Sequence, residues 1–196
     1  PNFDIDIQEI ERKITAKTRA VIINSPNNPT GKIYTKENLT KLAEVLRKHS
    51  GINGRPIFVV SDEPYVSLVY DNVEVPSLLN IYENVIIANS YSKELSLPGE
   101  RIGYALINPD CAGKNELFDS LTLCNRICGF VNAPAFIQRV IGELLDVKVD
   151  VDIYKKRRDL FYDILTNAGY ELYKPEGAFY LFVKSPIDDD IKFVNY

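Results

Sequence analysis

Three short runs of apolar, mostly β-branched residues constrain the fold of this chain more than any other feature. They occupy residues 19–24, 57–61 and 84–89 of the 196-residue sequence. Continuous apolar runs of this length, bounded by polar residues, favour strands that are buried on both faces. We therefore expect these runs to form neighbouring strands in the interior of one sheet.

Amphipathic segments surround these runs. Residues 6–14 predict a helix capped by Asp6, and Thr35 caps a longer predicted helix for which Gly51 is the expected end. The expected buried stripe of the longer helix consists of Leu39, Leu42, Ala43 and Leu46. Further helices are predicted over residues 114–125, 134–146 and 152–168.

The order of strand, helix, strand and strand is typical of the α/β class. We expect a mostly parallel sheet covered by helices. Beyond Gly169, residues 170–174 and 178–183 predict two strands of a smaller second domain. The boundary between the two domains is expected near residues 147–151.

Composition excludes several functional classes. The chain has 23 Lys and Arg against 27 Asp and Glu, so it lacks the basic surface of a nucleic-acid-binding protein. The basic run at residues 155–158 indicates a solvated helix face. No apolar run is long enough to cross a bilayer, which argues against a membrane partner. The three cysteines are odd in number, and the only histidine, His49, lies on a separate predicted helix. We therefore expect no metal site, reduced thiols and a cytoplasmic protein.

Polar side chains follow each predicted strand. The first strand runs into a loop over residues 25–31, which contains two prolines and presents Asn28. The second strand is followed by Asp62 and Tyr65, and the third by Lys93. Open sheets of this class bind ligands beyond the carboxyl ends of their strands. We expect the amide, carboxylate, phenol and amine of these residues to converge on one crevice.

The segment after the third strand carries two cations. Lys93 follows small hydroxyl residues, and Arg101 comes eight positions later, after a Pro98-Gly99 turn that can reverse the chain. Lysine forms Schiff bases with carbonyl groups, and arginine offers a planar fork for phosphoryl oxygens. These chemistries together suit a phosphorylated carbonyl compound. Taken alone, Lys93 and Arg101 equally fit a solvated loop that carries two ordinary charges.

The motifs together resemble those of the class I/II aminotransferases, which are fold-type I enzymes dependent on pyridoxal phosphate. The resemblance rests on Asn-Pro-Thr-Gly at residues 28–31, Ser-Asp-Glu-Pro-Tyr at 61–65, and Ser-x-Ser-Lys at 90–93 followed by Arg-Ile-Gly at 101–103. Residues 175–180, Pro-Glu-Gly-Ala-Phe-Tyr, resemble the small-domain strand region of the same family. The order and approximate separations of the motifs match as well, over nearly the whole chain.

This resemblance implies a cofactor and a role for each site residue. Lys93 would form the Schiff base with pyridoxal 5'-phosphate and later move the proton at the substrate's α-carbon. Asp62 would pair with the pyridine nitrogen and favour its protonated form. Tyr65 and Asn28 would donate hydrogen bonds to the phenolic oxygen. The residues expected at the phosphate are Ser90, Ser92 and Arg101.

The resemblance also implies an arrangement of domains. Residues 1–148 would be the latter part of the large cofactor-binding domain, and residues 149–196 the beginning of the small C-terminal α+β domain. The sequence begins with Pro1 and contains no methionine, so we expect a fragment of a longer protein. The family's phosphate-binding helix start, its ring stacked on the pyridine and its arginine for the substrate carboxylate fall outside the chain. We therefore expect the fragment to be inactive alone.

The parent enzyme would move an amino group between an amino acid and a 2-oxo acid, and is expected to be a homodimer. One alternative is a pyridoxal-phosphate-dependent carbon-sulfur lyase of the same fold. Tyr65 favours transamination, because that lyase group more often has a histidine at this position. A second alternative is the aminotransferase-like effector domain of a transcription regulator, which an upstream DNA-binding motif would identify.

Overall fold

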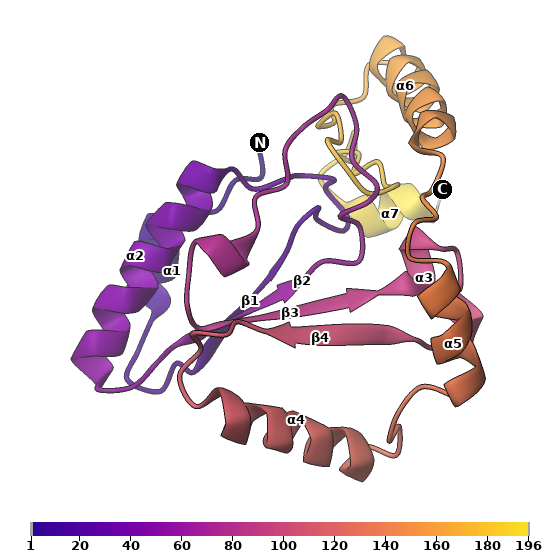
Figure 1. Cartoon of the computed structure of the whole chain (residues 1–196). Coiled ribbons are helices and arrows are strands. Elements are labelled where there is room, and N and C mark those ends of the chain that lie inside the picture. The colour runs from indigo at the N-terminus through magenta and orange to yellow at the C-terminus, as the bar shows by residue number, and fades with distance from the viewer. Residues whose placement is uncertain (1, 196) are drawn as a thin grey trace.

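A four-stranded sheet with the order β1-β2-β3-β4 forms the centre of the computed structural model, which describes residues 2–195. The strands are β1 (Ala20–Asn24), β2 (Phe58–Asp62), β3 (Val85–Ser90) and β4 (Gly103–Ile107). The first three pair in parallel and β4 runs antiparallel to β3 (Figure 1). The α/β class and the three expected strands are thus confirmed.

The register of the parallel strands aligns their carboxyl ends. Asn24 pairs with Asp62, and Asp62 pairs in turn with Ala88. Since parallel strands end at the same edge of a sheet, the loops that follow all three begin side by side.

Helices α1 (Ile7–Lys13) and α2 (Lys36–Asn53) cover one face of the sheet (Figure 1). Asp6 and Thr35 cap these helices as expected, accepting from the backbone amides of Glu9 and Asn38. The whole expected stripe of α2 is buried in the main core, together with Ile23, Ile57, Val59, Val85 and Ile87 of the sheet region and the residues Leu78 and Tyr82. On the opposite face, Ile22 is 75% exposed.

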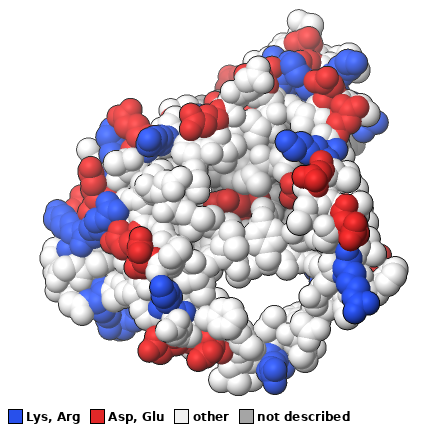
Figure 2. Space-filling model, in the orientation of Figure 1, with Lys and Arg blue, Asp and Glu red and all other residues white. Residues whose placement is uncertain are grey.

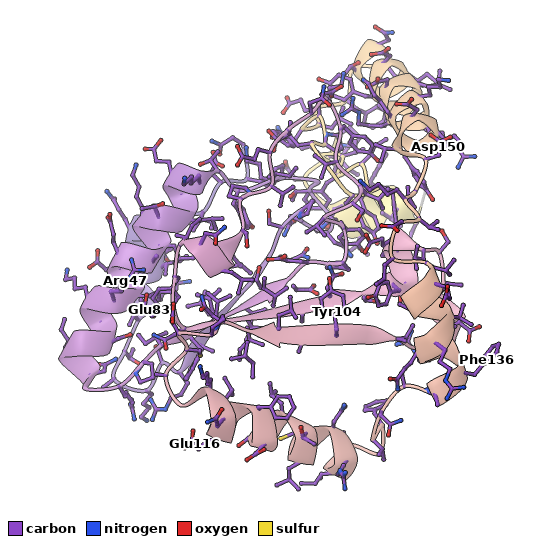
Figure 3. The ribbon with its side chains drawn as sticks, in the orientation of Figure 1. Arg47, Glu83, Tyr104, Glu116, Phe136 and Asp150 are labelled. Atoms are coloured by element: carbon purple, nitrogen blue, oxygen red, sulfur yellow. The ribbon has the colours of Figure 1, made fainter. Side chains whose placement is uncertain are left out.

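The expected end of α2 at Gly51 is wrong. The helix continues to Asn53, and Gly54 forms its C-cap with φ of +66°. A left-handed cap needs a residue without a Cβ, which either glycine could supply. The side chain of Arg47 on the same helix reaches Glu83, at 2.9 Å between Nη2 and Oε2 (Figure 3).

The chain reverses after β3 as the Pro-Gly turn predicts. A short helix α3 (Tyr91–Glu94) and a 3₁₀ turn η2 (Pro98–Glu100) lead into β4, which was not predicted. Ser90 pairs with Gly103 at this hairpin. Another 3₁₀ turn, η1 (Leu78–Asn80), lies between β2 and β3.

Helix α4 (Lys114–Ile127) buries none of its residues, although its pattern is amphipathic. Phe118 is 63% and Leu123 is 57% exposed. The space-filling view shows an opening between this helix and the sheet (Figure 2). Helix α5 (Ala135–Glu143) ends earlier than predicted and packs Ile137 and Ile141 against Ile102.

The C-terminal region contains α6 (Val151–Asn167) and the short helix α7 (Asp190–Val194). The two strands expected at residues 170–174 and 178–183 are wrong. Within the described residues, this region forms only an isolated bridge between Leu172 and Val183, and another between Val69 and Gly177. The β propensity of these segments is not matched by a neighbouring strand that could complete a ladder.

The expectation of a solvated basic run on α6 is wrong for Arg158. Its side chain is 4% exposed and pairs with Asp71 and Asp159. Its guanidinium also lies over the ring of Tyr70, at 4.5 Å from the centroid. Long cationic side chains are buried in proteins when such partners are present.

No helix among residues 2–195 is both long enough and apolar enough to cross a membrane. All three cysteines are free. Cys111 is buried, whereas Cys124 and Cys128 are exposed on α4 and at its end.

The two glycines at the end of α2 predict opposite effects of alanine on stability. Gly51 is helical with open space around it, so Gly51→Ala should raise the free energy of unfolding by about 0.5–1 kcal/mol. Gly54→Ala should lower it by about 1–2 kcal/mol, because alanine resists the left-handed conformation. Urea unfolding of both variants checks this, and equal effects of the two changes would contradict the assigned cap.

Candidate functional site

Three polar groups meet at the carboxyl edge of the sheet. The side-chain amide of Asn24 donates to the Asp62 carboxylate, at 3.2 Å between Nδ2 and Oδ2, and to the Asp62 carbonyl at 2.9 Å. The other end of the Asn24 amide accepts from the backbone N–H of Asn28 at 2.6 Å. Asn24 therefore couples two predicted site residues, Asn28 and Asp62, although the sequence pattern did not single it out.

The Asp62 carboxylate is exposed at the end of β2, on the side opposite to its neighbour Glu63. Partial burial raises its pKa above the ordinary value. Within the described residues, it forms no salt bridge. The carboxylate is thus oriented by an amide and can accept from a further cationic donor.

Tyr65 is 3% exposed and brings a phenol to the same edge. Its hydroxyl lies 2.8 Å from the hydroxyl of Tyr180. Burial raises the pKa of the Tyr65 phenol far above its ordinary value, whereas a hydrogen bond with Asn28 opposes this shift. Tyr65 is therefore a neutral phenol near pH 7 that can donate one hydrogen bond.

Lys93 lies on α3, beyond the end of β3, and is only partly exposed. Its Nζ lies 5.5 Å from the centroid of the Phe179 ring. No carboxylate among residues 2–195 forms an ion pair with it. An amine without a carboxylate partner and beside an apolar ring is suited to react with a carbonyl carbon.

Ser90, Ser92 and Arg101 form the other end of the site. The Ser90 hydroxyl caps α3, accepting from the Ser92 backbone N–H at 3.1 Å and donating to the Ser92 hydroxyl at 2.7 Å. Arg101 is exposed with φ of +51°, and its Nη1 donates to the Pro98 carbonyl at 2.8 Å. The pairing of Ser90 with Gly103 places the arginine at the same end of the β3-β4 hairpin.

The structure therefore links Asn28 to Asp62 through Asn24, and the Tyr65 phenol lies beside the Asn28 side chain. Lys93 is joined to this group through Phe179, whose ring centroid lies 5.5 Å from that of Tyr65. Ser90 and Ser92 bond to each other, and Arg101 bonds to Pro98. No hydrogen bond within the described residues links them to Asp62 or Tyr65.

Phe179 and Tyr180 are site neighbours that the sequence analysis missed. The motif at residues 175–180 was noted, but no role was given to its aromatic residues. A buried tyrosine needs a partner for its hydroxyl, which was the available signal.

Backbone hydrogen bonds hold residues 175–178 against the loops that carry Asn28 and Tyr65. The Gly31 carbonyl accepts from the amides of Glu176 and Gly177 at 2.9 and 3.0 Å. The amide of Ala178 donates to the Leu68 carbonyl at 2.9 Å. A Cβ at Gly177 would lie 2.9 Å from that carbonyl oxygen and 2.7 Å from Pro26, so only glycine permits this close approach.

Arg158 adds a polar anchor to the same contact. It donates to the Pro175 carbonyl at 2.9 Å, while its other nitrogens bind Asp71 and Asp159. Burial of Asp159 acts to raise its pKa, but hydrogen bonds from Lys155, Arg158 and Lys174 hold that pKa well below its ordinary value.

The ion pairs of Asp159 should make the stability of the chain depend on pH in the acid range. An acid whose folded pKa is depressed stabilises the fold above its unfolded pKa, near 4, and this contribution is lost as the pH falls through the folded value. Asp159→Asn should therefore lower the free energy of unfolding at pH 7 by about 1–2 kcal/mol, after allowance for partial exposure. When the pH is lowered below 4, the free energy of unfolding of the variant should then fall less than that of the unmodified chain. Urea unfolding at each pH would measure this.

A matched control is Asp163→Asn on the same helix, since Asp163 forms no salt bridge with any described residue. We expect the free energy of unfolding of Asp163→Asn to match that of the unmodified chain at pH 7 and below pH 4. An acid response in this control equal to that of Asp159→Asn would contradict the assigned role.

The donor set fits a phosphorylated pyridine aldehyde. An amine without an ion-pair partner can bond to the aldehyde carbon, and a carboxylate with room for a cationic donor can pair with a protonated ring nitrogen. A neutral phenol and an amide can donate to a phenolic oxygen. Hydroxyls and a guanidinium suit a phosphate.

Comparison with known proteins agrees with this chemistry. A sequence model of the family described as aminotransferase class I and II matches residues 1–193. A probable aspartate/prephenate aminotransferase of Rickettsia felis is 37% identical over 193 residues, covering 93% of this chain and 44% of the relative. An aspartate aminotransferase of Thermotoga maritima is 34% identical over 196 residues, covering 98% of this chain and 48% of the relative.

A solved structure is similar over nearly the whole chain. The crystal structure of an amino transferase from Eubacterium rectale is 46% identical and superposes with a TM-score of 0.96. The match covers 99% of this chain and 49% of that structure. The chain thus spans about half the length of the curated relatives and solved structures that it matches.

Proposed function

The chain belongs to the class I and II aminotransferase family, and from this we propose that it forms part of a longer enzyme that moves an amino group from an amino acid to a 2-oxo acid. The observation that carries the proposal is the meeting of Asn28, Asp62 and Tyr65 at the strand ends, with Lys93 beside them across Phe179. The names of the similar proteins support an acidic amino acid as one substrate class.

Pyridoxal 5'-phosphate is the cofactor that this donor set would hold. When bound, it supplies an aldehyde for the lysine and a ring that accepts electrons from the substrate's α-carbon. Asp62 would hold a proton at the pyridine nitrogen, and its raised pKa is compatible with a shared proton there. Tyr65 and Asn28 would donate to the phenolic oxygen. The phosphate would be bound by Ser90, Ser92 and Arg101.

Lys93 would act at two points. Its Nζ would be the group that holds the cofactor through the aldehyde carbon. With an amino substrate in the site, the same Nζ would hold and move the proton at the substrate's α-carbon, as a general base and then acid. The adjacent Phe179 ring would exclude water from this amine.

We also propose the division into domains. Residues 1–148 would be the latter part of the cofactor-binding domain and residues 149–196 the beginning of a small domain. The opening between α4 and the sheet, and the exposed apolar residues on α4, support a larger assembly than this chain forms alone. The longer enzyme would act as a homodimer, and its remaining segments would complete the substrate site.

The role of Lys93 predicts a site-specific label. Borohydride treatment of the longer enzyme loaded with cofactor should attach a phosphopyridoxyl group to Lys93, because reduction makes the lysine–cofactor bond permanent. Peptide mass mapping locates the group. Lys93→Ala should lose the label, whereas Lys41→Ala, on the exposed side of α2, should retain it on Lys93. A label on any other lysine of the unmodified enzyme would refute this role.

The role of Asp62 predicts a loss confined to the proton-transfer step. Asp62→Asn should still bind the cofactor but slow single-turnover transamination by about 100-fold or more, because the amide disfavours a protonated pyridine nitrogen. Stopped-flow absorbance with a single amino acid measures this rate. Glu63→Gln is the matched control, since Glu63 instead accepts from Ser61 at 2.7 Å. Near-normal rates in Asp62→Asn would sink the assignment.

A further inference from the structure

We propose that Tyr180 is a positioning residue that acts on the cofactor through Tyr65. This inference rests on the proposed function, because it concerns how the phenol of Tyr65 is held at the cofactor's phenolic oxygen. It assigns a function to Tyr180, the last residue of the segment over residues 175–180, which the proposed chemistry does not otherwise use.

The two hydroxyl groups are direct partners. The oxygens of Tyr65 and Tyr180 lie 2.8 Å apart, and the rings meet edge to face with centroids at 5.8 Å. Tyr65 is almost fully buried and Tyr180 partly so. A hydrogen bond between two such groups has a defined geometry and little competition from water.

The direction of this bond follows from what Tyr65 has to do. A hydroxyl has one proton to donate and lone pairs that accept. If Tyr65 donates its proton to the phenolic oxygen, it cannot donate to Tyr180. Tyr180 must then donate to Tyr65. The two phenols and the cofactor oxygen form a chain of donors, in which each bond polarises the next and makes Tyr65 a stronger donor.

The backbone holds Tyr180 in place for this role. Its neighbour Ala178 is fully buried, with its amide bonded to Leu68 and its carbonyl accepting from the Tyr70 hydroxyl at 2.5 Å. Leu68 and Tyr70 follow Tyr65 in the same loop. The hydrogen bonds of Ala178 therefore hold the segment that carries Tyr180 against the loop that carries Tyr65. Phe179, between Ala178 and Tyr180, places its ring against both Tyr65 and the Lys93 amine.

The test measures the basicity of the lysine nitrogen in the loaded enzyme, not its activity. A donor at the phenolic oxygen withdraws electron density from that nitrogen, so loss of the donor should raise the pH at which the visible absorbance band changes. Tyr180→Phe should increase the proton affinity about two- to ten-fold, the size expected for one lost hydrogen bond. Tyr65→Phe should increase it at least as much.

A double-mutant cycle distinguishes an effect transmitted through Tyr65 from a general loss of packing at the site. In the Tyr65→Phe background, Tyr180→Phe should have no further effect, because its hydroxyl acts only through Tyr65. Tyr154→Phe is the control: its ring stacks on Phe179 at 6.1 Å, but its hydroxyl bonds to no described residue at the site. Its absorbance titration should match that of the unmodified enzyme. Thermal midpoints show that each variant is folded.

Each result decides the proposal. An unchanged titration in Tyr180→Phe, or an effect that persists without the Tyr65 hydroxyl, would overturn the positioning role and leave the proposed function intact. An unmodified enzyme without a Lys93-dependent band would overturn the proposed function and the positioning role together. The expected pattern would support both: Tyr180→Phe shifts the titration of the otherwise unmodified enzyme but adds no shift in the Tyr65→Phe background.

Discussion

The parallel register of β1, β2 and β3 is the constraint on which the rest of the structure depends. It places Asn24, Asp62 and Ala88 in one row across the sheet, so the loops that follow must start at a common edge. Burial of Ile23, Val59 and Val85 against α2 fixes this register, because a slip by one residue would turn those side chains to the opposite face. The chemistry of the site therefore depends on the packing of this core.

A second constraint comes from the far end of the chain. The segment over residues 175–180 lies against the loops that carry Asn28 and Tyr65, and backbone hydrogen bonds, a glycine contact and Arg158 hold it there. This contact gives the buried phenol of Tyr65 its partner. The residues at the strand ends and the C-terminal segment thus share one aromatic group, in which a change on one side alters hydrogen bonding on the other.

Local sequence was enough to predict the features that depend on local physics. The caps at Asp6 and Thr35, the stripe of α2 and the three apolar strands all follow from short-range patterns, and the structure confirms them. The end of α2 was missed because Gly51 and Gly54 both fit a left-handed cap, and only the backbone conformation distinguishes them.

Features that depend on distant partners could not be predicted in this way. Arg158 is buried because it pairs with Asp71, which lies 87 positions away in the sequence. β4 was missed because its five residues are largely exposed and lack a buried run. The strand ends predicted that Asn28 and Asp62 would lie at one edge, since topology alone brings them together. The Tyr65–Tyr180 pair joins positions 115 apart and had no local signal.

That separation has a consequence for the order in which the molecule can assemble. During synthesis, the sheet and α2 emerge before residue 175, and their contacts span short stretches of chain. The hydrogen bonds from Glu176 and Gly177 to the Gly31 carbonyl close a loop that contains most of the chain. Contacts of such long range form after shorter ones because the entropy cost of closing the loop is greater. A nascent chain would therefore hold a formed core and an unfinished strand-end edge, with Tyr65 not yet bonded to Tyr180. A ligand that binds only the finished edge would then favour the last step of folding, because it draws the equilibrium toward the bound form.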